Sequence, residues 1–195
     1  MKFGKAVETF NITSTIGSLI MKHLSILFFC CAAVILSAAD AIVPPAGGTV
    51  KTATEGKISG QQGGFAVDFT LDFTDPDKDY VGYAVSCRNW KKPIRGFCFG
   101  VNRIKGNTCI WFYPLDENGK AFGFYKKYPL ETGKRYHAEI TWKDRQCKLT
   151  IDGRAVTGCR LREEITVFDT IEIGGLGGKN HGVTVHGFRF LESGK

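Results

Sequence analysis

The chain has 195 residues, of which 43% are hydrophobic and 12% aromatic, and its formal net charge is +7 at pH 7. This hydrophobic fraction is too high for a disordered chain, and the 24 glycines follow no collagen period. The length suits one domain of about 100–200 residues with a short additional segment.

The additional segment lies at the start of the chain. A short basic stretch, Met21-Lys22-His23, precedes an uncharged apolar run over residues 24–36, and small residues follow up to Ala39-Asp40-Ala41. This order is typical of a secretory signal peptide with an A-x-A-like cleavage site. Because a membrane-spanning helix needs about 20 apolar residues, we expect no membrane span after cleavage.

Residues 1–20 fit no signal pattern, and two interpretations of them stay open. Either Met21 is the true start and residues 1–20 are an upstream translation artefact, or residues 1–41 form one long leader. Both interpretations predict a leader over residues 1–41, with the signal peptide at 21–41, and a domain over residues 42–195. We therefore expect a secreted protein, or a periplasmic one if the source is bacterial.

The predicted domain is basic. Removing the leader takes away three Lys and two acidic residues, which leaves 23 basic and 17 acidic residues and a net charge of +6. Such a charge favours anionic partners. The sequence contains no recognition-helix or RNA-binding signature, so sulfated or uronic polysaccharides are expected as partners before nucleic acid.

The domain reads as β-strands nearly throughout. In residues 65–74 every second residue is apolar, beginning with Phe65, and this period of two indicates a strand with one buried face. Asp152-Gly153 suits a two-residue hairpin turn, and a change of phase at Gly187 predicts a β-bulge in the last strand. The remaining strands are expected, in chain order, at residues 81–87, 97–101, 136–142, 147–151, 154–156, 171–173 and 183–191. Many short strands between turns predict an all-β sandwich or barrel.

Three stretches, taken in order, resemble the laminin-G-like branch of the concanavalin A-like lectin and glucanase superfamily. Residues 133–142 resemble its G-x-W-H-x-v-x-i-x-W strand, but with Tyr136 in place of Trp and one extra residue after the glycine. Residues 149–153 resemble its l-x-v-D-G hairpin, and residues 171–190 resemble its closing pair of strands. The resemblance covers residues 65–191 and implies a two-sheet antiparallel jelly roll that binds glycans or proteins, a few relatives being hydrolases or lyases.

A catalytic role finds little support in the residues. Glucanase relatives carry a Glu-x-Asp-x-x-Glu strand that supplies two carboxylates to one face, and this chain has no such run. A lyase would use a base such as His137 with an arginine that neutralises a uronate, and Arg135 and Glu139 do share the predicted face of His137. The resemblance, however, implies a structural role for His137, so we name no catalytic residue.

One acidic loop is a candidate metal site. Asp75, Asp77 and Asp79 have the D-x-D-x-D spacing of a calcium loop, and carboxylate oxygens suit that ion. Tyr80 and Ser86 stand where an EF-hand has Gly and Glu, so the loop is no EF-hand. A plain turn between two strands is the alternative, and no cofactor is required.

A basic loop is the candidate ligand-binding site. Arg88, Trp90, Lys91, Lys92 and Arg95 place four cations around one indole between two predicted strands. An indole offers a flat face on which a sugar can stack, and the cations can pair with sulfate or carboxylate. The alternative is a solvated connector with the tryptophan folded onto the rim of the core.

Five cysteines fall in the domain, and an oxidising compartment would permit disulfides. We expect Cys98 and Cys109 to face each other across a hairpin centred between residues 103 and 104. Cys147 and Cys159 come within one residue of facing each other across Asp152-Gly153, so a bulge would pair them. These pairings would leave Cys87 free, and buried, unpaired cysteines are the alternative throughout.

The sequence therefore predicts a secreted, single-domain β-sandwich that binds carbohydrate, with anionic glycans favoured and no catalysis. An extracellular protein-interaction or adhesion module of the same fold is the first alternative, and a polysaccharide hydrolase or lyase is the second.

Overall fold

The computed structural model describes residues 41–75, 77–89 and 91–191, and every regular element in these ranges is a β-strand. The chain from Ala41 onward forms one compact unit. The predicted leader, apart from Ala41, lies outside the described residues. No helix among the described residues has the length and apolar character needed to cross a membrane.

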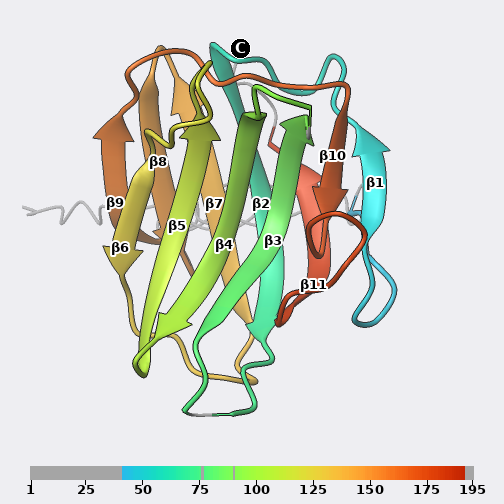
Figure 1. Ribbon diagram of the computed structural model, residues 1–195, viewed down its shortest axis with the longest axis vertical. Helices are drawn as coiled ribbons and strands as arrows, with labels where there is room; N and C mark the ends of the chain where they lie inside the picture. Colours follow the sequence, from blue (N-terminus) through green and yellow to red (C-terminus); the bar gives the residue numbers. More distant parts are fainter. Residues whose placement is uncertain (1–40, 76, 90, 192–195) are drawn as a thin grey trace, which may run out of the picture. The chain divides into compact units, whose positions relative to one another are not determined.

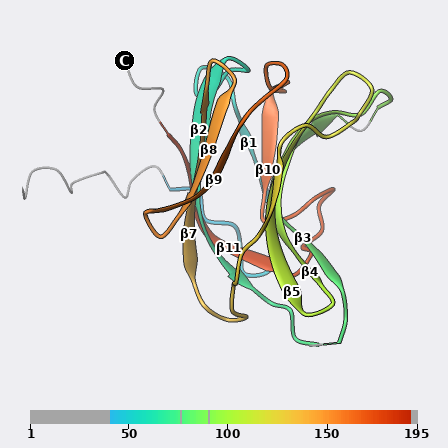
Figure 2. The same cartoon turned by 90° about the vertical axis from the view of Figure 1, so that its left-hand side faces the viewer.

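The strands form two antiparallel sheets, which confirms the predicted sandwich. Figure 1 looks onto the larger sheet, and Figure 2 shows the two sheets edge-on as separate layers. In spatial order the six-stranded sheet consists of β1 (Val50–Ala53), β10 (Thr170–Ile173), β3 (Tyr80–Asn89), β4 (Arg95–Ile104), β5 (Asn107–Leu115) and β6 (Phe124–Lys127). The five-stranded sheet consists of β11 (Val183–Phe190), β2 (Gln62–Leu71), β7 (Tyr136–Lys143), β8 (Gln146–Ile151) and β9 (Arg154–Arg160).

Three predictions from local sequence patterns are confirmed by the structure. The alternation that begins at Phe65 belongs to β2, whose apolar positions are buried. Asp152 and Gly153 form the β8–β9 turn with positive φ angles of 49° and 74°, as a hairpin turn of this kind requires. The register of β11 against β2 shifts between Val185 and Gly187, which confirms the predicted bulge and returns Phe188 to the core.

The strand β5 was not predicted, because its apolar residues occupy both phases of the alternation. Ile110 and Phe112 are fully buried in the core between the sheets, and Trp111 between them is only 2% exposed on the opposite face. A strand that is buried on both faces shows no period of two in its hydrophobicity.

The predicted hairpin between Cys98 and Cys109 is wrong in register. The turn lies at Lys105-Gly106, where both residues have positive φ angles of 49° and 75°, the conformation that a two-residue hairpin turn needs. This turn lies two residues later than the expected midpoint. Cys98 is therefore opposite Tyr113, and Cys109 is opposite Asn102, so the two cysteines do not face each other.

The core between the two sheets is built around Phe65. Its ring centroid lies 5.7–6.4 Å from the centroids of five other aromatic rings, three of which belong to the opposite sheet. These neighbours are Phe97, Phe99, Phe112, Trp142 and Phe188. Because aromatic rings bury large areas and gain from edge and offset contacts, this cluster helps to hold the two layers together.

We expect Phe65→Ala to lower the free energy of unfolding by about 3–5 kcal/mol, since it removes a buried ring and leaves a cavity. Tyr125→Ala is the matched control, because that ring is 46% exposed and its loss should cost less than about 1 kcal/mol. Urea unfolding of both variants measures the difference. Equal losses would contradict the central role of Phe65.

Candidate functional site

A row of aromatic side chains crosses the outer face of the six-stranded sheet, the face turned away from the other layer. The register aligns Tyr83 on β3, Gly100 on β4, Trp111 on β5 and Tyr125 on β6. The residues before and after Trp111 point into the core, so Trp111 itself points outward. Strand pairing therefore brings together aromatic residues that lie far apart in the sequence.

Trp111 is the centre of this row. Its ring stacks on Tyr113 with 4.9 Å between centroids and meets the ring of Tyr83 edge-on at 5.1 Å. Its indole nitrogen, Nε1, donates a hydrogen bond of 2.7 Å to Oδ1 of Asn102. Tyr113 in turn stacks on Tyr125 at 6.4 Å. The rings are therefore held by one another and by the sheet.

Gly100 provides the space in which Trp111 lies. A Cβ atom on Gly100 would stand 2.6 Å from Cζ2 of Trp111 and 1.9 Å from the carbonyl oxygen of Gly82. Both distances are shorter than van der Waals contact, so any side chain at this position would displace the indole or part the strands. The absence of a side chain on β4 is thus what lets the tryptophan lie close against the sheet.

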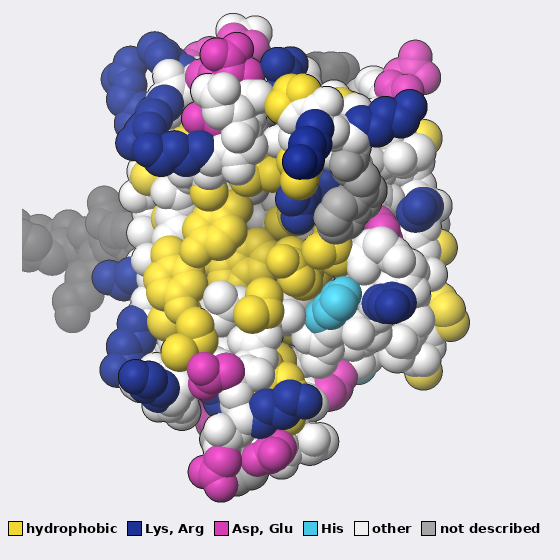
Figure 3. Space-filling model, in the orientation of Figure 1, with side chains coloured by type: hydrophobic (Ala, Val, Ile, Leu, Met, Phe, Trp, Pro, Cys, Tyr) yellow, Lys and Arg dark blue, Asp and Glu magenta, His cyan; other side chains and the backbone are white. Residues whose placement is uncertain are grey.

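Tyr83, Trp111 and Tyr113 line a shallow depression of about 100 Å³, and Tyr125 lies beside it, stacked on Tyr113. Figure 3 shows a continuous hydrophobic patch on this face, with Lys and Arg side chains around it. Tyr125 and Val81 are the most exposed members of the patch, at 46% and 50%. The depression is lined by Val81, Tyr83, Arg88, Cys98, Asn102, Trp111, Tyr113 and Leu115. We call these eight residues together with Tyr125 the aromatic face.

The tyrosines of the aromatic face keep their protons at neutral pH. Burial raises the pKa of Tyr83 and of Tyr113 above the usual value for a phenol. A hydrogen bond with the thiol of Cys109 raises the pKa of Tyr125 to about 12. Each hydroxyl is therefore a neutral group that can both donate and accept a hydrogen bond.

The structure brings one of the predicted loop residues onto the aromatic face. Arg88 lines the depression, and its guanidinium interacts with the thiol of Cys98. Lys91 and Lys92 are exposed in the β3–β4 connection, and Arg95 is exposed at the start of β4, opposite Asn89. Trp90 lies outside the described residues. The predicted loop is thus a basic margin of the site, and the site itself extends over the neighbouring strands.

Sequence reasoning missed the aromatic floor. Residues 81–87 were predicted as a strand with Tyr83 in its buried phase, and no strand was predicted from Cys109 to Leu115. The available signal was the alternation of Trp111 and Tyr113 with core residues on a strand that is apolar in both phases. An apolar residue in the outward phase is the unusual feature in a strand of this kind.

In the acidic loop, the carboxylates of Asp75 and Asp79 accept hydrogen bonds from backbone N–H groups of the chain. Oδ1 of Asp75 accepts a hydrogen bond from the backbone N–H of Asp77, and Oδ1 of Asp79 accepts one from Lys105 in the β4–β5 turn. The first contact is the local bond of a turn. The described residues include no cluster of three His, Cys, Asp or Glu side chains able to hold a metal ion. Calcium binding at Asp75, Asp77 and Asp79 stays a prediction from the sequence.

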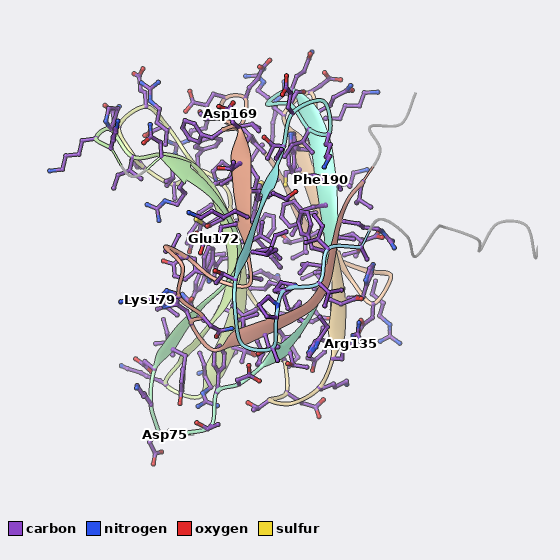
Figure 4. The ribbon with its side chains drawn as sticks, turned by 90° about the vertical axis from the view of Figure 1, so that its right-hand side faces the viewer. Asp75, Arg135, Asp169, Glu172, Lys179 and Phe190 are labelled. Atoms are coloured by element: carbon purple, nitrogen blue, oxygen red, sulfur yellow. The ribbon has the colours of Figure 1, made fainter. Side chains whose placement is uncertain are left out.

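The outer face of the five-stranded sheet differs from the aromatic face, because it carries a network of charges. Nδ1 of His137 lies 2.6 Å from Asp68 and Nε2 lies 3.3 Å from Glu139. Arg135, which Figure 4 labels on this sheet, contacts Asp68 at 3.0 Å, and Arg189 lies 3.7 Å from Glu139. Both ring nitrogens of His137 thus have carboxylate partners from the chain itself.

Pairing in this network shifts two pKa values in opposite directions. Partial burial alone would lower the pKa of His137, but the hydrogen bonds to Asp68 and Glu139 outweigh it and raise the pKa. Partial burial alone would raise the pKa of Asp68, but the hydrogen bonds from His137 and Arg135 outweigh it and lower the pKa. The charged forms of both groups are therefore favoured in the folded state.

In the glycine-rich connection between β10 and β11, backbone N–H groups donate hydrogen bonds to a carboxylate of the same chain. The carboxylate of Glu172, labelled in Figure 4, accepts hydrogen bonds of 3.1 Å and 2.6 Å from the backbone N–H groups of Gly177 and Gly178. These N–H groups form an anion-binding arrangement, and the chain supplies the anion itself.

Comparison with solved structures identifies the architecture. The chain is similar to galectin LEC-6 from Caenorhabditis elegans, with a TM-score of 0.53 and 14% identity over 80% of this chain and 99% of that one. It is similar to the CBM40 of the Ruminococcus gnavus IT-sialidase, which was solved bound to α2,3-sialyllactose (TM-score 0.54, 15% identity, 78% and 89% covered). A heptameric SAP-like pentraxin from Limulus polyphemus gives a TM-score of 0.55 at 15% identity, with 82% and 80% covered.

These likenesses establish the fold, since all three identities are low. They show the two-sheet β-sandwich, and the assignment to the concanavalin A-like superfamily and its laminin-G-like branch stays a prediction. No protein-family model matches the chain, and no curated protein matches its sequence.

The His137 network predicts a defined pH dependence of stability. Because the folded pKa of His137 is raised above 6.5, its contribution is present below pH 6.5 and is lost as the pH rises through the raised value. Because the folded pKa of Asp68 is lowered below 3.8, its contribution is present above pH 3.8 and is lost as the pH falls through the lowered value. The difference in free energy of unfolding between the wild type and His137→Gln should therefore be greatest between pH 3.8 and pH 6.5.

Urea unfolding of the wild type and His137→Gln across this pH range measures the difference. His186→Gln is the control, because His186 bonds only to the neutral hydroxyl of Thr70 among the described contacts. A difference that grows steadily above pH 7 would contradict the assignment.

Proposed function

We propose that the protein is a secreted, non-catalytic, lectin-like module that binds carbohydrate on the aromatic face. One observation carries this proposal: the rings of Tyr83 on β3 and of Trp111 and Tyr113 on β5 line an open depression on the outer side of the six-stranded sheet, and Tyr125 of β6 stacks beside them. Ligand sites are typically concave and apolar with a few polar groups placed among the rings, and the aromatic face has this composition.

The chemistry of the aromatic face suits a sugar ring. The apolar C–H side of a saccharide packs against aromatic surfaces such as those of Tyr83 and Tyr113. The phenol hydroxyls of the three tyrosines supply hydrogen-bonding groups for sugar hydroxyls at the edges of the rings. The ring positions are set by stacking and by the Trp111–Asn102 hydrogen bond, so little ordering is required on binding.

The basic margin supports a preference for anionic glycans. Arg88 lines the depression, Lys91 and Lys92 lie exposed in the β3–β4 connection, and Arg95 is exposed at the start of β4. Guanidinium groups form strong paired hydrogen bonds with carboxylate and sulfate-like oxyanions, and the net positive charge attracts anionic polymers over longer distances.

A protein-interaction module of the same fold is the second candidate. The exposed Val81 and Tyr125 form part of an apolar patch, and such patches also mark protein-binding surfaces. A salt-insensitive interaction with an extracellular protein, without any glycan binding, would favour this candidate.

A glycan array that includes sulfated and uronic polymers, run with calcium and with a chelator, tests the proposed function. We expect binding to acidic glycans that weakens as salt is added, because exposed charges are screened. Loss of binding with the chelator would in addition support a metal at the acidic loop. No binding to any glycan in either buffer would contradict the proposal, and shortening of a polysaccharide would contradict its non-catalytic part.

Two substitutions locate the binding surface. Tyr113→Ala should weaken glycan binding about tenfold, which corresponds to about 1.4 kcal/mol, whereas Tyr113→Phe keeps the ring and should lose less.

Arg88→Gln should weaken binding of acidic glycans and reduce its salt dependence. Arg154→Gln, the same change of charge at the exposed start of β9 on the other sheet, is the control and should leave binding unchanged. Titration calorimetry measures all four, and equal effects of the two arginine substitutions would contradict a site at the aromatic face.

A further inference from the structure

The β8–β9 hairpin places two cysteines directly opposite each other. The turn at Asp152-Gly153 alone would pair Cys147 with Gly158, but the register shifts by one residue between Leu149 and Thr150. After this shift Cys147 is paired with Cys159. The bulge expected from the sequence is therefore present, and it brings the two cysteines opposite each other.

The two side chains are in contact. Directly opposed residues of an antiparallel pair have Cα atoms about 4.5–5.5 Å apart, within the range of about 4.4–6.8 Å found in disulfides. A hydrogen bond joins the thiols of Cys147 and Cys159. This bond lowers the pKa of Cys159 to about 7 and raises the pKa of Cys147. Cys159 is partly exposed on an edge strand, whereas Cys147 is buried.

The other described cysteines lack this arrangement. Cys98 and Cys109 lie opposite Tyr113 and Asn102. The thiol of Cys87 is hydrogen-bonded to the backbone of Phe168, and burial raises its pKa to about 11. Burial also raises the pKa of Cys98 to about 12. Because the thiolate is the reactive form, Cys159 is the best placed of these thiols to begin an exchange reaction.

We propose that Cys147 and Cys159 form a disulfide that fastens the edge strand β9 to β8. The electron acceptor is an external disulfide, either of low molecular weight or on an oxidoreductase. The Cys159 thiolate attacks one sulfur of the external disulfide and releases one thiolate. Cys147 then loses its proton and attacks the Cys159 sulfur, which releases the second thiolate. Two protein thiols are thereby oxidised, and the external disulfide is reduced to two thiols.

The cross-link would act at one edge of the five-stranded sheet. The strand β9 has only β8 as a neighbour in its sheet, and edge strands are held by one ladder of hydrogen bonds. It also lies beside β6, the strand that carries Tyr125, at the same side of the sandwich (Figure 1). Fastening β9 would therefore steady the side of the sandwich next to the aromatic face.

Peptide mapping of the full chain after exposure to oxidised glutathione tests the proposal. Free thiols are alkylated under denaturing conditions before digestion and mass spectrometry. We expect a cross-linked peptide containing Cys147 and Cys159, lighter by two hydrogens than its two parts, while Cys87, Cys98 and Cys109 are alkylated. Alkylation of both Cys147 and Cys159, or a link from either to another cysteine, would overturn the proposal.

Thermal unfolding gives a second and independent test. Reduction should lower the melting temperature of the oxidised wild type by about 5–10 °C, because the cross-link restricts the unfolded chain. Cys159→Ser should show no change on reduction, whereas Cys109→Ser should retain the wild-type response. An equal response to reductant in Cys159→Ser and the wild type would overturn the proposal.

Discussion

The aromatic face depends on one close approach, that of the Trp111 indole to the backbone at Gly100. A Cβ atom at this position would overlap both the indole and the neighbouring strand, so the tryptophan can lie against the sheet only because β4 has a glycine there. Tyr113 and Tyr83 then pack on the two sides of the fixed indole, and Asn102 holds its N–H. The site is thus rigid because its centre is nearly as well packed as the core, a property that reduces the entropy lost on binding.

The two outer faces of the sandwich show how unusual the aromatic face is. On the five-stranded sheet, the outward positions are filled by charged groups that pair with one another, with His137 between Asp68 and Glu139. This is the expected arrangement for a sheet with one face in water. On the six-stranded sheet, the same positions carry aromatic rings around an open depression. Such an apolar cluster on an outer face is the observation on which the proposed binding site rests.

Local patterns in the sequence were sufficient for much of the fold and for only one margin of the site. The alternation in β2 and the phase change at Gly187 are properties of a single strand, and both predictions were confirmed. The aromatic row depends on the register of four strands, and β5 itself is hidden by apolar residues in both phases. The prediction that Cys98 pairs with Cys109 was wrong for a related reason. The turn lies at Lys105-Gly106, two residues later than expected, and this displacement changes every cross-strand partner along the hairpin.

The central claim is that ligands bind at the aromatic face. The most direct test is an NMR titration of the isotope-labelled protein with a sulfated or uronic oligosaccharide that binds it. We expect the indole N–H resonance of Trp111 and the resonances of Tyr83 and Tyr113 to shift on binding. The indole N–H of Trp142, which is buried in the core and bonded to Ser59, should stay in place. Shifts confined to the surroundings of His137 on the opposite sheet, with the Trp111 resonance unmoved, would contradict the account.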